Sequence, residues 1–138
     1  MRRTILLSLA ALASPLAAQN APALFDSTRT TPLTPGQWSY AASPSGSEAR
    51  FGTAFAIRCD RVARRVTLRR SDAVPSALTI GTDLSVRTIA ADGAVATTDP
   101  VLDAIAFSRG RFIVVGGGAE LILPASPEAA RSIEDCRI

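Results

Sequence analysis

Residues 49–59 read ARFGTAFAIRC, in which the bulky apolar residues Phe51, Phe55 and Ile57 all stand at odd-numbered positions. One face carries the odd-numbered residues Ala49, Phe51, Thr53, Phe55, Ile57 and Cys59. The opposite face carries Arg50, Gly52, Ala54, Ala56 and Arg58. Because successive side chains of a β-strand point to opposite faces, this period of two predicts one long, half-buried strand. We expect Cys59, on the inward face, to lie in the core.

The same period continues on both sides of this stretch. Trp38 and Tyr40 alternate with small or polar residues before a predicted turn over residues 43–47. The run 65–70 places Val66 and Leu68 inward, and Arg65, Thr67 and Arg69 outward. Further short strands are expected over residues 77–81, 84–90, 94–97, 112–115 and 120–123. Two turns are predicted between them, a hairpin turn at Asp92-Gly93 and a flexible hairpin tip at Gly116-Gly117-Gly118.

Two helix signals interrupt the strands. Asp99-Pro100 is typical of a helix start, since Asp caps free N–H groups and Pro suits the first helical position. Gly110 fits a left-handed stop after this helix. Ser126-Pro127 begins a second helix, on which Ile133 and Cys136 share a stripe. The chain is therefore predicted to be mainly β, a small antiparallel β-sandwich or barrel with one or two short helices and one disulfide.

The chain has two cysteines, Cys59 and Cys136. An even number of cysteines in an exported chain is typical of a disulfide. The alternatives are free thiols and a metal site, but the chain has no His to complete a set of metal ligands. We expect a disulfide between the last helix and the strand over residues 49–59, and we expect neither a metal nor a cofactor.

The N-terminal residues 1–18 have the features of a secretory signal peptide. Arg2 and Arg3 precede an apolar run over residues 5–16, and the small residues Ala17 and Ala18 suit cleavage after Ala18. The run is shorter than the roughly 20 residues that span a bilayer; an uncleaved anchor is the alternative. We therefore expect bacterial export to the periplasm or medium, with no transmembrane segment after cleavage. A flexible, extended Pro/Thr-rich leader over residues 19–36 is expected to precede a single β-rich domain over residues 37–138.

Arginine supplies all 15 basic residues, against 12 acidic ones. Since the signal peptide carries two of them, the mature chain is close to neutral, which argues against nucleic-acid binding. Arginines are nevertheless dense between residues 58 and 70, and two more flank Gly110. The candidates for binding an anion are Arg58, Arg65, Arg69, Arg109 and Arg111. The alternative is that these arginines are solvated and protect a strand edge from pairing.

Catalytic constellations are missing from the sequence. Without His, neither a Ser–His–Asp nor a Cys–His site can form within the chain. The carboxylate groupings worth testing are Asp99 with Asp103 and Glu134 with Asp135. Asp99 is expected to cap a helix, and the adjacent Glu134 and Asp135 point in different directions on a helix, so neither pair suits acid–base catalysis. We expect a protein that is not an enzyme.

Five segments of the chain together resemble a set of short exported bacterial proteins of unknown function. They are Pro35–Trp38, Phe55–Asp60, Asp99–Ala104, Phe107–Phe112 and Ile133–Arg137. The resemblance implies a periplasmic β-rich fold and no known activity. The chain is also distantly similar to the invasion-associated locus B family, which has more cysteines. This similarity rests on a strand that begins with Trp38, a core cysteine at Cys59, a late helix and a final cysteine at Cys136. That likeness implies an envelope location and an interaction with the host or the envelope.

The expected function is therefore a non-enzymatic domain that binds an envelope protein or an anionic glycan or lipid. The alternative is a periplasmic enzyme inhibitor of lysozyme-inhibitor-like architecture, since such inhibitors are also small, β-rich and disulfide-linked. That alternative rests on architecture alone.

Overall fold

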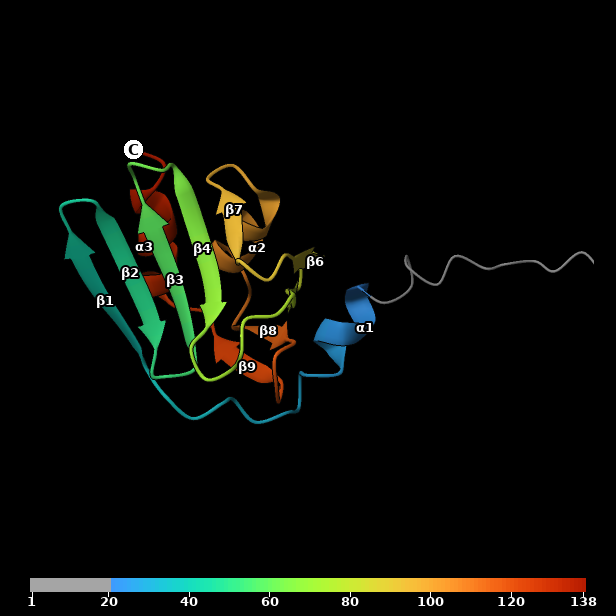
Figure 1. Cartoon of the computed structure of the whole chain (residues 1–138). Coiled ribbons are helices and arrows are strands. Elements are labelled where there is room, and N and C mark those ends of the chain that lie inside the picture. The colour runs from blue at the N-terminus through green and yellow to red at the C-terminus, as the bar shows by residue number, and fades with distance from the viewer. Residues whose placement is uncertain (1–20) are drawn as a thin grey trace, which may run out of the picture.

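The computed structural model describes residues 21–138, so the signal peptide predicted over residues 1–18 lies outside the described residues. Within that range nine strands form two antiparallel sheets (Figure 1). The large sheet has the order β1 (Trp38–Ser43), β2 (Gly46–Phe51), β3 (Phe55–Asp60), β4 (Arg65–Arg70) and β7 (Ala94–Ala96). The small sheet has the order β6 (Val86–Ile89), β5 (Leu78–Gly81), β8 (Arg111–Val115) and β9 (Leu121–Pro124). The helices are α1 (Ala21–Asp26), α2 (Pro100–Ala106) and α3 (Pro127–Asp135).

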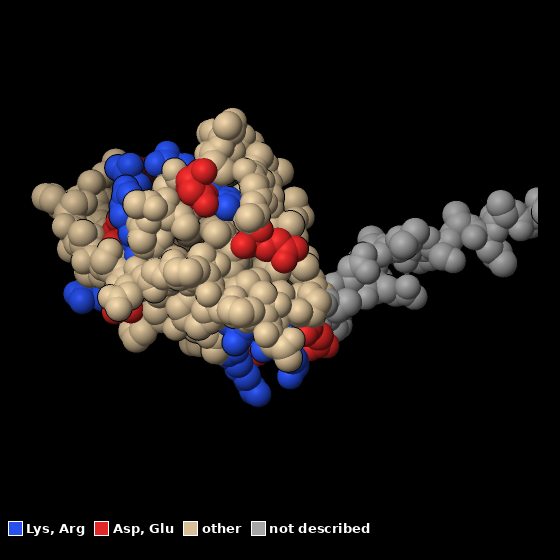
Figure 2. Space-filling model, turned by 90° about the horizontal axis from the view of Figure 1, so that it is seen from below, with Lys and Arg blue, Asp and Glu red and all other residues tan. Residues whose placement is uncertain are grey.

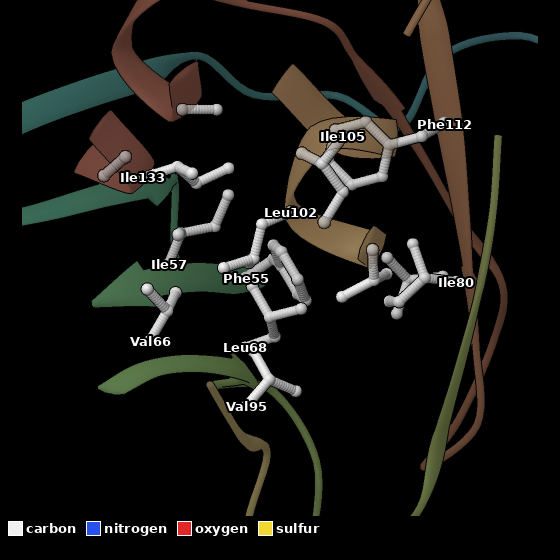
Figure 3. Close-up of a cluster of buried hydrophobic side chains, with 14 of the residues drawn as sticks. Phe55, Ile57, Val66, Leu68, Ile80, Val95, Leu102, Ile105, Phe112 and Ile133 are labelled. Atoms are coloured by element: carbon white, nitrogen blue, oxygen red, sulfur yellow. The ribbon is translucent and has the colours of Figure 1, made fainter. Parts of the chain in front are cut away.

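One hydrophobic core joins the two sheets and the two later helices. Figure 3 shows side chains from the large sheet, such as Phe55 and Leu68, pointing toward Phe112 and Ile80 of the small sheet and toward Leu102 of α2. Helices α2 and α3 lie behind the large sheet in Figure 1, where α3 packs on β1, β2 and β3. The expectation of a mainly β, sandwich-like fold is confirmed. The large sheet is covered on its inner face, and its outer face carries no helix or strand of the described chain.

The disulfide and the caps of the two later helices are confirmed. Cys59 and Cys136 are bonded, with their Cα atoms 5.4 Å apart. The Asp99 Oδ1 atom accepts from the Val101 N–H at 3.0 Å, and the Ser126 Oγ atom accepts from the Ala129 N–H at 3.2 Å. These caps fix where α2 and α3 begin, and the disulfide ties the end of α3 to β3.

The prediction of a single strand over residues 49–59 was wrong. The stretch is a hairpin, in which β2 and β3 pair with Phe51 opposite Phe55. Gly52 takes a left-handed φ of +52°, which a glycine adopts without strain, and the Ala54 N–H donates to the Phe51 carbonyl at 3.0 Å. Thr53 is consequently exposed at the turn instead of lying in the core.

The hairpin predicted at Asp92-Gly93 was also wrong. This turn connects β6 to β7, and those two strands belong to different sheets. The chain crosses here from the small sheet to the large one, because β7 pairs with β4 and β6 pairs with β5.

The segment that precedes β1 differs from the extended leader predicted over residues 19–36. Residues 21–26 form α1, Phe25 is buried, and Leu24 packs against Gly81 of β5. A Cβ atom at Gly81 would lie 3.0 Å from the Leu24 Cδ2 atom, so the glycine makes room for this contact. Farther along, the Thr34 N–H donates to the Ile122 carbonyl at 2.9 Å. The segment is therefore anchored to the small sheet at Leu24 and Thr34, whereas residues 29–33 between them are exposed.

Candidate functional site

The outer face of the large sheet carries four arginines, which we call the arginine face: Arg50, Arg58, Arg65 and Arg69. Strand alternation produces this arrangement. In β4, for example, Val66 and Leu68 are buried on the inner side, so Arg65 and Arg69 point outward. All four arginines are exposed.

The strand register sets the order of these arginines across the sheet. Arg69 lies opposite Ala56 of β3, and Ala56 in turn lies opposite Arg50 of β2. In the next row, Arg58 lies between Glu48 and Thr67. Although Ala56 is on the outer face, it is buried, and we attribute this to the aliphatic stems of the two flanking arginines. The side chains of Arg50 and Arg69 therefore flank the small Ala56 side chain.

Positive charge exceeds negative charge on this face. Glu48 forms an ion pair with Arg50, and the Asp60 Oδ1 atom accepts from the Ala63 N–H at 2.9 Å in the turn after β3. Within residues 21–138 no salt bridge involves the three remaining arginines of the face. Three of the five predicted anion-binding residues, Arg58, Arg65 and Arg69, are thus brought together with their guanidinium groups unpaired by the described chain.

The other two predicted residues, Arg109 and Arg111, lie at the small sheet and are not part of the arginine face. Arg111 donates to the carbonyls of Thr28 and Thr31, at 2.9 and 2.7 Å, and so holds the segment after α1. Arg109 has its Nε atom 3.7 Å from the Asp83 carboxylate. These arginines line a hollow of about 430 Å³ together with Phe25, Arg29 and Asp83. Figure 2 shows the basic atoms in separate groups on opposite sides of the molecule.

Arg70 belongs to the arginine-dense stretch, yet its side chain is directed inward and is 5% exposed. Its Nε and Nη2 atoms donate to the two Asp72 carboxylate oxygens at 2.9 and 2.8 Å. Its Nη1 atom donates to the carbonyls of Gly116 and Ala119, at 2.8 and 2.6 Å. The hydrogen bond from Arg70 lowers the pKa of the Asp72 carboxyl. Arg70 therefore holds the β8–β9 tip that the sequence predicted to be flexible.

A polar seam joins α3 to the large sheet, and sequence reasoning missed it. The Tyr40 hydroxyl donates to the Asp135 carboxylate, and the Ser132 Oγ atom lies 3.2 Å from the Ser47 Oγ atom. Burial raises the pKa of Asp135, but hydrogen bonds from Tyr40 and Ser47 and the nearby charges of Arg61 and Arg131 outweigh burial, so this pKa lies below its usual range. The inward parity of Tyr40 and Ser47 was the signal available in the sequence.

The carboxylates considered for acid–base work have structural partners. Asp99 caps α2 and pairs with Arg87 at 3.0 Å. Asp103 and Glu134 both pair with the Arg137 Nη1 atom, at 2.7 and 3.1 Å. Each of these groups thus takes part in holding α2 or α3 in place.

Residues 21–138 contain no group of three or more His, Cys, Asp or Glu side chains placed to hold a metal ion. No helix in this part of the chain is long and apolar enough to cross a membrane. Comparison with protein-family models, with curated proteins and with solved structures finds no match.

Proposed function

We propose that this chain is an exported, non-enzymatic binding domain that holds an anionic polymer, such as an acidic polysaccharide of the bacterial envelope, on its arginine face. The observation that carries this proposal is the group of unpaired guanidiniums at Arg58, Arg65 and Arg69 on an uncovered sheet. Arginine suits such a ligand because its planar group binds carboxylate or sulfate with two hydrogen bonds.

The shape of the face favours a polymer over a small anion. Neighbouring strands are about 4.8 Å apart, and outward residues of one strand are about 7 Å apart, so the arginines form a shallow array and not a pocket. The hollow at Arg109 and Arg111 is the more enclosed basic site, but its arginines are occupied by Asp83, Thr28 and Thr31. A polymer with repeated acidic groups contacts several points of the array at once.

A membrane into which the protein inserts apolar side chains is a less suitable ligand for the arginine face. The large exposed apolar side chains of the described chain are Leu33, Val62, Val74, Leu84, Phe107 and Ile138. None of them lies on a strand of the large sheet. Stable membrane binding usually needs apolar insertion besides charge.

Two charge-reversal variants test the proposal against a matched control. The variant Arg65→Glu/Arg69→Glu alters the arginine face, and Arg29→Glu/Arg109→Glu makes the same net-charge change at the small sheet. Binding to a sulfated polysaccharide and to a polyuronate is measured by titration at several salt concentrations. We expect the first variant to bind at least about tenfold more weakly and the control to bind like the wild type, with wild-type affinity falling as salt rises. Equal losses in both variants, or a wild type that binds neither polymer, would refute the proposal.

Enzyme inhibition is the second candidate, and one loop favours it. After α2 the chain exposes Phe107 and Arg109, the latter with 91% of its side chain accessible. The Arg109 N–H donates to Asp83 at 3.3 Å, so this loop lies beside the β5–β6 turn that carries the exposed Leu84. An aromatic and a basic side chain on such a loop are typical of protein contacts. A panel of lysozymes assayed with the wild type and with Phe107→Ser tests this candidate; inhibition that the substitution abolishes would support it over polymer binding.

A further inference from the structure

The sheets of the described chain end in four edge strands, and three of these are guarded. At β9, Thr34 bonds to both the N–H and the carbonyl of Ile122 at 2.9 Å. Strand β7 is only three residues long, and the Thr97 carbonyl just beyond it accepts from the Arg137 side chain at 3.0 Å. Strand β6 is four residues long and carries Arg87. Short length, charge and cover are the means by which natural edges avoid pairing.

Strand β1 has none of these protections. It is six residues long, WSYAAS, without charge or proline, and no described element lies beyond it in Figure 1. The nearest charged residue after it in the chain is Glu48, in the neighbouring strand. An uncharged, fully formed edge of this length is ready to pair with another strand.

The ladder with β2 shows which backbone groups are available. The Gly52 N–H donates to the Gln37 carbonyl at 3.1 Å, which makes residues 37 and 52 a hydrogen-bonded pair. Hydrogen-bonded and non-hydrogen-bonded pairs alternate along an antiparallel ladder. The backbone N–H and carbonyl groups of Ser39, Ala41 and Ser43 are therefore the ones that bond to β2. The N–H and carbonyl groups of Trp38, Tyr40 and Ala42 therefore point away from the sheet, and no other group within residues 21–138 bonds to them.

We propose that β1 is an interface between two copies of this chain, which pair their β1 strands antiparallel about a twofold axis at Tyr40. In this register Tyr40 faces its own copy, and Trp38 of each chain faces Ala42 of the other. Each such pair exchanges two backbone hydrogen bonds. The result is one continuous sheet made of both large sheets, with the two arginine faces on the same side.

Three features favour a second copy over a foreign strand. A twofold axis at Tyr40 brings no like charges of β1 together, because the strand has none. On the outer face, Ser39 meets Ala41 of the other chain, and both side chains are small. Beside the edge of β1, Glu128 and Arg131 of α3 line a hollow of about 290 Å³, and the Arg131 guanidinium lies over the ring of the inward-facing Tyr40. Across the twofold axis, Glu128 of each copy lies toward Arg131 of the other copy, so the two α3 helices present opposite charges to each other.

Sedimentation equilibrium of the full exported chain with its disulfide intact tests the proposal. We expect a monomer–dimer equilibrium that is measurable at protein concentrations up to about 1 mM. A Kd of that size is at the weak end of specific association. Ala42→Pro removes an outward N–H without removing a bond to β2, so it should weaken the dimer at least about tenfold, while Ala42→Ser should leave it unchanged. If proline perturbs the strand, Ala41→Arg places like charges near the axis, and Ala96→Arg at the opposite edge of the same sheet is its control.

Cross-linking tests the register. In the proposed dimer, residues 39 and 41 of opposite chains form a non-hydrogen-bonded pair with Cα atoms about 4.5 Å apart, within the range for a disulfide. A mixture of Ser39→Cys and Ala41→Cys proteins should therefore form a covalent dimer under mild oxidation faster than either variant alone. A wild type that stays monomeric, a dimer that Ala42→Pro and Ala41→Arg leave intact, or β1 bound only by a strand of another protein would overturn the proposal.

Discussion

Replacing Arg70 with Met removes the one arginine of the dense stretch that the structure places inside the molecule. The substitution keeps the unbranched stem, so packing is largely retained, but it deletes all the hydrogen bonds of the guanidinium group. Two carbonyls of the β8–β9 tip and the Asp72 carboxylate lose their donor. Stability should fall, whereas a solvated surface arginine would be replaced without loss.

The size of the loss follows from the burial of each partner. The two carbonyls belong to a tip that water can partly reach, so each lost donor costs about 1 kcal/mol, the low end of the range for an unsatisfied group. Asp72 is 34% exposed, so its pair with Arg70 is weaker than a fully buried one and contributes about 1–2 kcal/mol. We expect Arg70→Met to lower the free energy of unfolding by about 3–4 kcal/mol.

Urea unfolding followed by the fluorescence of Trp38, the only tryptophan of the chain, measures this loss. The indole N–H donates to the Pro124 carbonyl of β9 at 2.8 Å, so its signal reports on the contact between the sheets. Arg69→Met is the matched control, one residue away and outward, and should change stability by less than about 0.5 kcal/mol. An Arg70→Met protein as stable as this control would refute the structural role assigned to Arg70.

Two further predictions concern the disulfide and acid. Cys59→Ala/Cys136→Ala frees a link across 77 positions, and we expect a loss of about 2–5 kcal/mol in unfolding free energy by the same urea assay; equal stability with and without the bond would contradict this. Some carboxyls have a lower pKa in the folded chain than in the unfolded chain, so the unfolded chain binds more protons in acid. Their contribution to the free energy of unfolding is fully present above the ordinary pKa of 3.8. It is lost as the pH falls through the lowered pKa of the folded chain. Urea midpoints should thus be flat from about pH 8 to 5 and fall below about pH 4, because the chain has no His to titrate in between; a step near neutral pH would contradict this. The carboxyls concerned are Asp72, Asp99 and Asp135.

The faces of the strands could be predicted from the sequence because parity is a local property. Cross-strand partners share a face, and Phe51 lies opposite Phe55 across the turn at Gly52. The odd residues therefore stay inward whether residues 49–59 form one strand or a hairpin, and the alternation alone could not distinguish the two. The same parity places Arg70 inward with Val66 and Leu68, although its charge suggested the surface.

Apart from the Cys59–Cys136 disulfide, the long-range contacts discussed next could not be predicted from the sequence. Leu24 and Phe25 are isolated apolar residues in a Pro/Thr-rich segment, and their docking depends on the space left by Gly81 of β5. The separation of Arg109 and Arg111 from the arginine face depends on which sheet β8 joins, and local periodicity does not specify that partner. The structure therefore brings together three of the five predicted arginines, those of β3 and β4, and places the other two elsewhere.

Mapping the bound polymer by amide NMR tests the arginine face most directly. A short sulfated oligosaccharide is titrated into the isotope-labelled protein, and shifts of backbone amides are followed residue by residue. We expect the largest shifts in β2, β3 and β4 around Arg58, Arg65 and Arg69, and these shifts should diminish when salt is raised. Shifts confined to the hollow at Arg109 and Arg111, or to the exposed loop after α2, would contradict the account.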